Sequence, residues 1–151
     1  MKAVIALGSN LGDLADQINQ AVLELRKIGT VEKISSFYQT KPVGGPVQAD
    51  FLNAVLILDT HLEPDDLLSK CQAIENYFGR VREVKWGPRT LDIDLIAIDD
   101  LVINTESLKI PHPLAHERKF VLEPWVEIDP DGAIVGKGKI SQLLARFNSE
   151  E

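Results

Sequence analysis

The chain has 151 residues, 44% of them hydrophobic, and this size predicts one compact domain over residues 1–151 with a substantial core. Its formal charge of −7 at pH 7 argues against a broad basic face for nucleic acid and favours a small phosphorylated ligand. One cysteine excludes an internal disulfide, and no apolar run reaches the roughly 20 residues of a membrane span, so we expect a cytoplasmic monomer that binds neither membrane nor nucleic acid.

The first part of the chain alternates between apolar strands and one amphipathic helix. Residues 2–8 form a short apolar run before a turn, which is typical of a buried strand. Asp13 is placed to cap a helix whose apolar side chains repeat every three or four residues, and Gly29 is expected to end it. Residues 31–37 are rich in strand formers. After a loop rich in proline and glycine, residues 51–58 predict a further strand.

A second helix and another strand follow. Pro64 suits the first turn of the helix and Gly79 its end. After a loop rich in arginine, residues 91–98 predict a strand. The order β-α-β-β-α-β is that of the ferredoxin-like sandwich, so we expect an α+β fold with helices on one face of an antiparallel sheet. Residues 101–151 are expected to extend this domain, with a modest helix over residues 140–147.

Two aspartates near the start of the last predicted strand form a candidate metal site. Side chains alternate along a strand, so Asp92 and Asp94 point the same way while the residues between and beside them face the core. Mg²⁺ commonly takes one or two carboxylates and completes its coordination with water and phosphate oxygens. A solvated strand face is the default explanation for an isolated pair of aspartates, but two adjacent carboxylates can also supply the ligands that Mg²⁺ needs beside phosphate oxygens.

Three arginines precede the acidic pair. Arg80, Arg82 and Arg89 can donate paired hydrogen bonds to phosphate oxygens and together suggest a polyphosphate clamp. From spacing alone, surface ion pairs with nearby carboxylates are an equally good explanation. The turn at residues 8–13 fits neither GxGxxG nor GxxxxGK[ST], so ATP would have to bind without a Walker A lysine.

Aromatic and amide side chains suggest a site for a flat heterocycle. Phe51, Trp86 and Phe120 are candidate stacking surfaces, although core packing is the simpler explanation for each phenylalanine alone. Asn53 shares a strand face with Phe51, and its amide can pair with the edge of a heterocycle. We expect a single hydrogen-bonding role for His112 rather than a zinc site, because the prolines on either side interrupt a helix.

Taken together, the chain resembles the 6-hydroxymethyl-7,8-dihydropterin pyrophosphokinase family over nearly its whole length. The resemblance rests on residues 6–12 (ALGSNLG), 35–38 (SSFY) with Thr40, 51–54 (FLNA), 79–82 (GRVR), 86–94 (WGPRTLDID) and 110–113 (IPHP). It implies a ferredoxin-like fold. It also implies transfer of diphosphate from MgATP to the pterin hydroxymethyl group, with AMP leaving, in folate biosynthesis.

The resemblance implies roles for individual residues. Asp92 and Asp94 would hold two Mg²⁺ ions that bridge the ATP phosphates, and Arg80 and Arg89 would assist the transfer. The positions that match the ATP site are Gln72, Glu75, Arg82, Trp86, Arg89, Leu95, His112 and Arg118. The positions that match the pterin pocket are Thr40, Pro42, Val43, Phe51, Asn53, Trp86 and Phe120, with Phe51 and Phe120 as the stacking rings.

Several positions depart from the family's best-known bacterial pattern. Phe51 replaces a tyrosine, and Ser107 and Lys109 stand where an arginine and a threonine often contact the nucleotide. The loop between Arg82 and Trp86 is one residue short. These departures concern the detail of ligand binding.

The expected mechanism is an in-line attack of the hydroxymethyl oxygen on the β-phosphorus, catalysed by positioning and charge stabilisation. No side chain clearly qualifies as its general base. Two other functions fit the same topology and residues. One is a non-catalytic module that binds a ligand or RNA, although residues 51–58 lack the aromatic and basic pattern of an RNA-recognition strand. The other is a metal-dependent phosphoesterase that uses the same aspartates and arginines.

Overall fold

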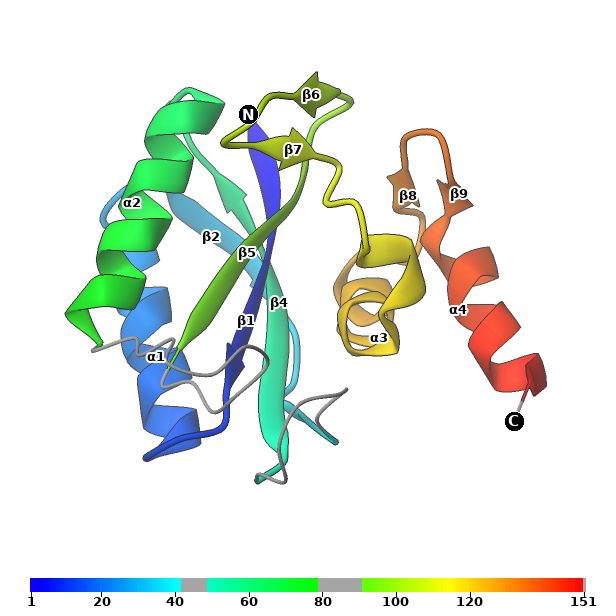
Figure 1. Ribbon diagram of the computed structural model, residues 1–151, viewed down its shortest axis with the longest axis horizontal. Coiled ribbons are helices and arrows are strands. Elements are labelled where there is room, and N and C mark those ends of the chain that lie inside the picture. The colour runs from blue at the N-terminus through cyan, green and yellow to red at the C-terminus, as the bar shows by residue number, and fades with distance from the viewer. Residues whose placement is uncertain (42–48, 79–90, 151) are drawn as a thin grey trace.

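The computed structural model of the chain describes residues 1–41, 49–78 and 91–150. These residues form a five-stranded sheet, two short hairpins and four α-helices (Figure 1). The strands of the sheet are β1 (Lys2–Ser9), β2 (Thr30–Ile34), β3 (Tyr38–Thr40), β4 (Phe51–Asp59) and β5 (Asp92–Ile98). The hairpins are β6 (Ile103–Asn104) with β7 (Lys109–Ile110), and β8 (Ala133–Ile134) with β9 (Gly138–Lys139). The helices are α1 (Leu14–Leu25), α2 (Pro64–Tyr77), α3 (Lys119–Ile128) and α4 (Ile140–Glu150), with a 3₁₀ turn at Ala115–Glu117.

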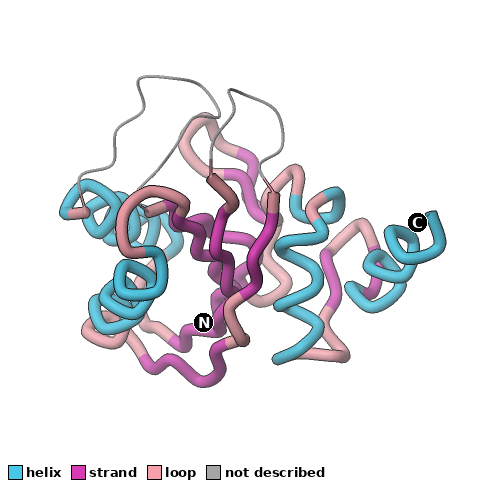
Figure 2. The backbone as a smooth tube through the Cα atoms, turned by 90° about the horizontal axis from the view of Figure 1, so that it is seen from below, coloured by secondary structure: helices cyan, strands magenta, loops and turns pink. Residues whose placement is uncertain are grey.

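The sheet is antiparallel and has the strand order β2-β4-β1-β5. β3 continues the β2 edge by pairing with β4. The central strand β1 therefore lies between β4 and β5, and its residues from Ala3 to Gly8 are flanked by both strands. Helices α1 and α2 lie against one face of the sheet, and α3 and α4 lie on the other side (Figures 1 and 2).

Both helices of the first layer form where the sequence predicts them. The carboxylate of Asp13 accepts a hydrogen bond from the backbone N–H of Asp16 at 3.2 Å, which caps α1, and α2 begins at Pro64. The end of α1 differs from the expectation, because the helix stops at Leu25. Gly29 has another function: a Cβ there would lie 2.5 Å from the carbonyl oxygen of Asp59, so only glycine fits beside β4.

The second face of the sheet differs from the expectation of helices on one face only. Val4, Val55 and Ile96 of the sheet pack with apolar side chains of α3 and α4, and this cluster includes the buried Trp125. β4 carries a continuous buried run rather than an alternating one, which is typical of a strand covered on both sides. The C-terminal extension is therefore a third layer of the fold. Among the described residues, none of the helices combines the length and the apolar character needed to cross a membrane.

Candidate active site

The register of three strands brings predicted metal and pterin residues to one end of the sheet. Gly8 of β1 pairs with Asn53 of β4 on one side and with Asp92 of β5 on the other. One strand step further in, Ala6 pairs with Asp94. Paired residues share a face of a sheet, so the amide and both carboxylates lie on the face that α3 covers. A Cβ on Gly8 would lie 3.0 Å from Oδ1 of Asn53, so glycine leaves room above the strand here.

Three of the predicted pterin residues lie together beside Gly8. Tyr38 pairs with Asn53 and Thr40 pairs with Phe51 across β3 and β4. The amide Nδ2 of Asn53 donates a hydrogen bond to Oγ1 of Thr40, and Asn53 is only 7% exposed. This bond fixes the amide, whose Oδ1 lies on the side of Gly8. The half-buried Phe51 ring also approaches Gly8, so an aromatic face and an amide edge adjoin the same open spot.

The start of α3 brings a cation and a second ring to the acidic pair. Arg118 directly precedes α3, and its Nη1 lies 3.9 Å from Oδ2 of Asp94. Its guanidinium carbon lies 5.6 Å from the centre of the Phe120 ring. Asp94 retains 42% of its side-chain exposure, so the carboxylate is open to a ligand. Arg118 thus links the predicted metal residues to the second predicted stacking ring.

His112 lies near Asp94 and Arg118. Its backbone N–H donates to the carbonyl of Ile96 at 2.8 Å, and its ring Nδ1 accepts from the N–H of Leu114 at 3.1 Å. Burial lowers the pKa of His112, and the positive charge of Arg118 lowers it further, while Asp94 acts in the opposite direction. The ring is therefore neutral near pH 7. Because Nδ1 accepts, Nε2 carries the proton and can donate a hydrogen bond to an anionic ligand.

Residues of α2 approach the same end of β5 from the other face. Glu75 is buried, and its Oε2 accepts a hydrogen bond at 2.8 Å from the backbone N–H of Ile93, the residue between the two aspartates. Gln72 is exposed on α2. Leu95 packs in the core under α1 and α2 and is 5% exposed, so its side chain offers little surface to a nucleotide.

The remaining predicted residues are of two kinds. Pro42, Val43, Arg80, Arg82, Trp86 and Arg89 lie outside the described residues. Ser107 and Lys109 lie in the β6–β7 hairpin, where Nζ of Lys109 donates to Oδ1 of Asn104 at 2.9 Å and to the carbonyl of Thr105 at 3.2 Å. The ammonium group of Lys109 thus has partners within its own hairpin.

Sequence reasoning missed two features of the site. Asn10 donates from Nδ2 to the carbonyl of Ala49 at 3.0 Å, which ties the end of β1 to the residue that leads into β4. Glu127 of α3 accepts hydrogen bonds from Ser36 and Tyr38. These two residues belong to the edge strand, the name used below for residues 30–40, which comprise β2, β3 and the three residues between them. The motif at residues 35–38 marked one side of this second contact, but its partner is about 90 positions away, and no local pattern identifies it.

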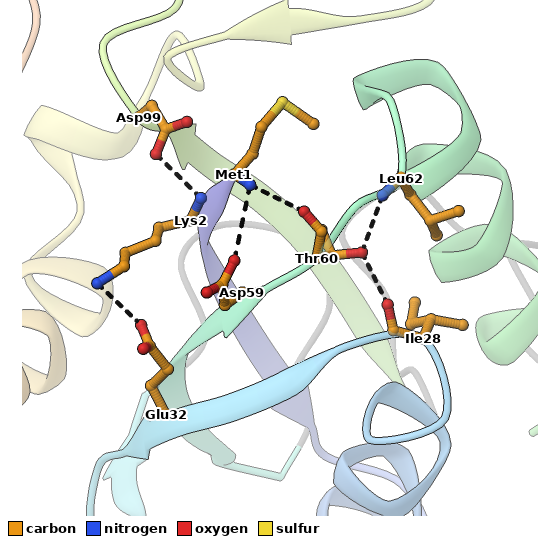
Figure 3. Close-up of polar contacts among 8 residues, drawn as sticks. All are labelled: Met1, Lys2, Ile28, Glu32, Asp59, Thr60, Leu62 and Asp99. Carbon is orange, nitrogen blue, oxygen red and sulfur yellow. Dashed lines mark hydrogen bonds and ion pairs between the residues drawn. The ribbon is translucent and has the colours of Figure 1, made fainter.

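Two cavities lie at the opposite end of the sheet, one of about 310 Å³ near Thr60 and one of about 490 Å³ near Lys2. Polar groups there are bonded to one another (Figure 3): Nζ of Lys2 lies 3.3 Å from Oε1 of Glu32, and Oγ1 of Thr60 donates to the carbonyl of Ile28 at 2.7 Å. Asp99 accepts from the backbone N–H of Lys2 at 2.9 Å. These polar groups are therefore engaged within the fold, whereas the described residues of the predicted metal and pterin sites lie at the other end of the sheet.

Residues 4–130 match the sequence model of the 7,8-dihydro-6-hydroxymethylpterin-pyrophosphokinase family. The chain belongs to this family. A relative from Bacillus subtilis, named 2-amino-4-hydroxy-6-hydroxymethyldihydropteridine pyrophosphokinase, is 50% identical over 128 residues, which are 83% of this chain and 77% of the relative. A relative of the same name from Haemophilus influenzae is 40% identical over 147 residues, which are 96% of this chain and 92% of the relative.

Solved structures of longer chains share this fold. The wild-type HPPK-DHPS of Plasmodium falciparum, solved with pteroate, superposes with a TM-score of 0.79 at 16% identity. The match covers 99% of this chain and 44% of that one, so this chain spans less than half the length of the HPPK-DHPS chain. At this identity the likeness shows a common fold.

Proposed function

We propose that the chain transfers diphosphate from MgATP to the hydroxymethyl group of 6-hydroxymethyl-7,8-dihydropterin, a step of folate biosynthesis. The observation that carries this proposal is the register at Gly8, which sets an amide and an aromatic ring on one side and two carboxylates on the other. A heterocycle bound beside Asn53 would lie two strands away from Asp92 and Asp94, on the same face of the sheet. Family membership supports the same reaction.

The donor set fits a hard divalent cation. Asp92 and Asp94 supply carboxylate oxygens on one face of β5, which is the ligand type that Mg²⁺ prefers. We propose that these side chains hold two Mg²⁺ ions together with the ATP phosphates. Bound Mg²⁺ offsets negative charge on the transferred group. Glu75 supports this arrangement from the other face, because its bond to the N–H of Ile93 fixes the backbone between the two aspartates.

The pterin would be held by the group around Asn53. Thr40 accepts one N–H of the Asn53 amide, which leaves the second N–H and Oδ1 for the donor and acceptor edge of a pterin. Phe51 and Phe120 offer aromatic faces on the same side of the sheet. We infer that Pro42, Val43 and Trp86 complete this pocket, in line with the family resemblance.

The transfer would proceed by in-line attack. The hydroxymethyl oxygen forms a bond to the β-phosphorus while the bond from that phosphorus to the bridging oxygen of the α-phosphate breaks, so AMP leaves and the hydroxyl proton is lost. Arg118, which lies 3.9 Å from Asp94, and the Nε2–H of His112 would stabilise phosphate oxygens bound there. We infer that Gln72, Glu75 and Arg82 line the nucleotide site, with Leu95 packed beneath it in the core, and that Arg80 and Arg89 assist the transfer.

We further infer that the fold is the ferredoxin-like sandwich with a C-terminal extension and that residues 1–151 form a single domain. The strand order β2-β4-β1-β5, with helices α1 and α2 on one face, supports this assignment. The same fold serves many functions, so the fold assignment supports the proposed reaction only together with the residues around Gly8.

One assay separates this function from its alternatives. The purified chain is incubated with MgATP, with and without 6-hydroxymethyl-7,8-dihydropterin, and AMP and the pterin diphosphate are measured. We expect both products only when the pterin is present. Hydrolysis of ATP without pterin would indicate a phosphoesterase, and binding of either ligand without any AMP would indicate a non-catalytic module. Either result would overturn the proposed function.

A further inference from the structure

Glu127, an exposed residue of α3, bonds to the edge strand next to the proposed pterin residues Thr40, Phe51 and Asn53, which are called the pterin group below. Its Oε1 accepts from the hydroxyl of Tyr38 at 2.6 Å. The backbone N–H of Ser36 donates to both carboxylate oxygens, at 3.1 and 3.0 Å, and the Ser36 hydroxyl donates to Oε2 at 3.0 Å. A single carboxylate therefore holds Ser36, which lies between β2 and β3, and Tyr38, the first residue of β3, using both of its oxygens.

The edge strand shifts its register at the point that Glu127 holds. Ile34 of β2 pairs with Leu56, whereas Tyr38 of β3 pairs with Asn53, so four steps on the edge strand correspond to three on β4. Ser35 spans the break, because its N–H donates to the carbonyl of Val55 and its Oγ accepts from the N–H of Val55, both at 2.9 Å. The strand thus contains one extra residue, as in a β-bulge.

This shift decides which side chains of the edge strand face the pterin group. A slip of one residue turns every side chain of a strand to the other face. With the observed register, Tyr38 and Thr40 share the face of Asn53, while Phe37 packs in the core under α1 and α2. Without the extra residue, Phe37 would pair with Asn53, and Thr40 would face away from the amide that it binds.

We propose that Glu127 is a positioning residue for pterin binding, which holds the shifted register of the edge strand and so keeps Thr40 facing Asn53. The inference rests on the proposed function, since it takes Thr40 and Asn53 as pterin residues. Glu127 acts through Ser36 and Tyr38. Its link runs from the C-terminal layer of the fold to the edge strand, so α3 sets the geometry of a pocket whose polar residues lie on β3 and β4.

The hydrogen bond between Tyr38 and Glu127 shifts the pKa of both groups, and general destabilisation of the protein would not reproduce the effect of losing it. The hydrogen bond to Glu127 is the main cause that raises the pKa of Tyr38 to about 12, with burial and the charges of Glu127 and Glu123 adding to it. The bond from Tyr38 is likewise the main cause that lowers the pKa of Glu127. Tyr77 is the other tyrosine of the chain, so a Tyr77→Phe background isolates Tyr38 in an ultraviolet titration.

The test uses Glu127→Ala, Glu127→Gln and Tyr38→Phe in the pyrophosphokinase assay. Loss of the charged partner in Glu127→Ala should raise the KM for the pterin about tenfold, a typical size for a lost charge-assisted bond, while KM for ATP and kcat change less than about twofold. Glu127→Gln keeps an acceptor and should lie between Glu127→Ala and the wild type. In the Tyr77→Phe background, Glu127→Ala should return the titration of Tyr38 toward its ordinary value of about 10.

Glu32→Gln is the matched control, because Glu32 is a carboxylate of the same sheet edge whose partner, Lys2, lies at the other end of the sheet. It should leave both KM values unchanged. An unchanged pterin KM in Glu127→Ala and Tyr38→Phe, or an equal rise in the KM for ATP, would overturn the inference. Inactivity of the wild-type chain would instead reject the proposed function, so the two failures are distinguishable.

Discussion

Gly8 is the residue at which the two halves of the candidate site meet. Its neighbours across the sheet are Asn53 and Asp92, so any side chain here would stand between the proposed pterin and metal residues. Gly8 lies on β1, whose residues from Ala3 to Ser9 are buried or half-buried, and it belongs to a regular strand. The glycine is therefore best explained by the close approach of a ligand rather than by a turn.

Gly8→Ala tests that explanation. The added Cβ would lie 3.0 Å from Oδ1 of Asn53 and 3.9 Å from the Phe51 ring, so it would push the amide and narrow the site. We expect the KM for the pterin to rise several-fold with little change in the melting temperature. Steady-state kinetics and circular dichroism measure the two quantities. A variant with the wild-type pterin KM would show that no ligand approaches the strand at this point.

Asp92→Asn tests the metal assignment. The substitution keeps the size of the side chain but removes its negative charge, so cation binding should fail and Mg²⁺-dependent turnover should fall by a factor on the order of 10² or more. The melting temperature should change little. Asp99→Asn, at the turn after the same strand, is the control and should retain activity. A near wild-type kcat for Asp92→Asn at saturating Mg²⁺ would reject the assignment.

Asn53→Leu tests the recognition of the heterocycle. Leucine cannot pair with a pterin edge and leaves Thr40 without its donor, so pterin binding should weaken by about 1–3 kcal/mol. ATP binding should be nearly unaffected, because the described nucleotide residues His112 and Arg118 lie near Asp94, on the other side of Gly8. Calorimetry with each ligand separately measures both effects. Equal losses for the two ligands would point to damage of the sheet.

At the scale of elements, α3 joins the core to the site. Its buried face carries Trp125, which is 2% exposed, and its N-terminal end carries Phe120 after Arg118. Its exposed side carries Glu127, which reaches the edge strand. One helix thus packs the second face of the sheet and positions groups at two sides of the candidate site, so its packing should matter for activity as well as for stability.

Trp125→Ala measures the contribution of that packing. Removing a buried tryptophan leaves a cavity against Val4, Val55 and Ile96, and the typical cost is about 3–5 kcal/mol. Urea unfolding followed by circular dichroism gives the change in free energy of unfolding. Val135→Ala, at an exposed position of the β8–β9 hairpin, should change stability by less than about 0.5 kcal/mol. A similarly small effect of Trp125→Ala would mean that α3 is only loosely attached.

The sequence predicted correctly those features of the fold and the site that depend on the pattern of side chains within one strand or helix. The alternation around Asp92 and Asp94 placed both carboxylates on one strand face, and the capping by Asp13 located the start of α1. The packing of α3 on the second face escaped prediction, because residues 119–128 contain Pro124, which reads as a helix breaker. The pairing of Asn53, Gly8 and Asp92 depends on register between distant strands, which side-chain patterns within one strand do not determine.

At the scale of the whole molecule, a single sheet is shared by two cores. Leu25 and Cys71 belong to the core under α1 and α2, while Val55 and Trp125 belong to the core under α3 and α4. β4 contributes to both, since successive residues along it face opposite sides. Loss of either core would leave one face of the sheet exposed to water, so the two layers should unfold together.

Unfolding measured by two probes checks this expectation. In a Trp86→Phe background, Trp125 is the only tryptophan, and its fluorescence reports the α3 core while far-ultraviolet circular dichroism reports all helices and strands. The two signals should share one urea midpoint. Leu25→Ala, in the opposite core, typically costs about 2–5 kcal/mol and should lower the midpoint of both signals equally, because the destabilisation is transmitted through the shared sheet. A Trp125 transition that Leu25→Ala leaves in place would show that the C-terminal layer is an independent unit and that residues 1–151 are not a single domain.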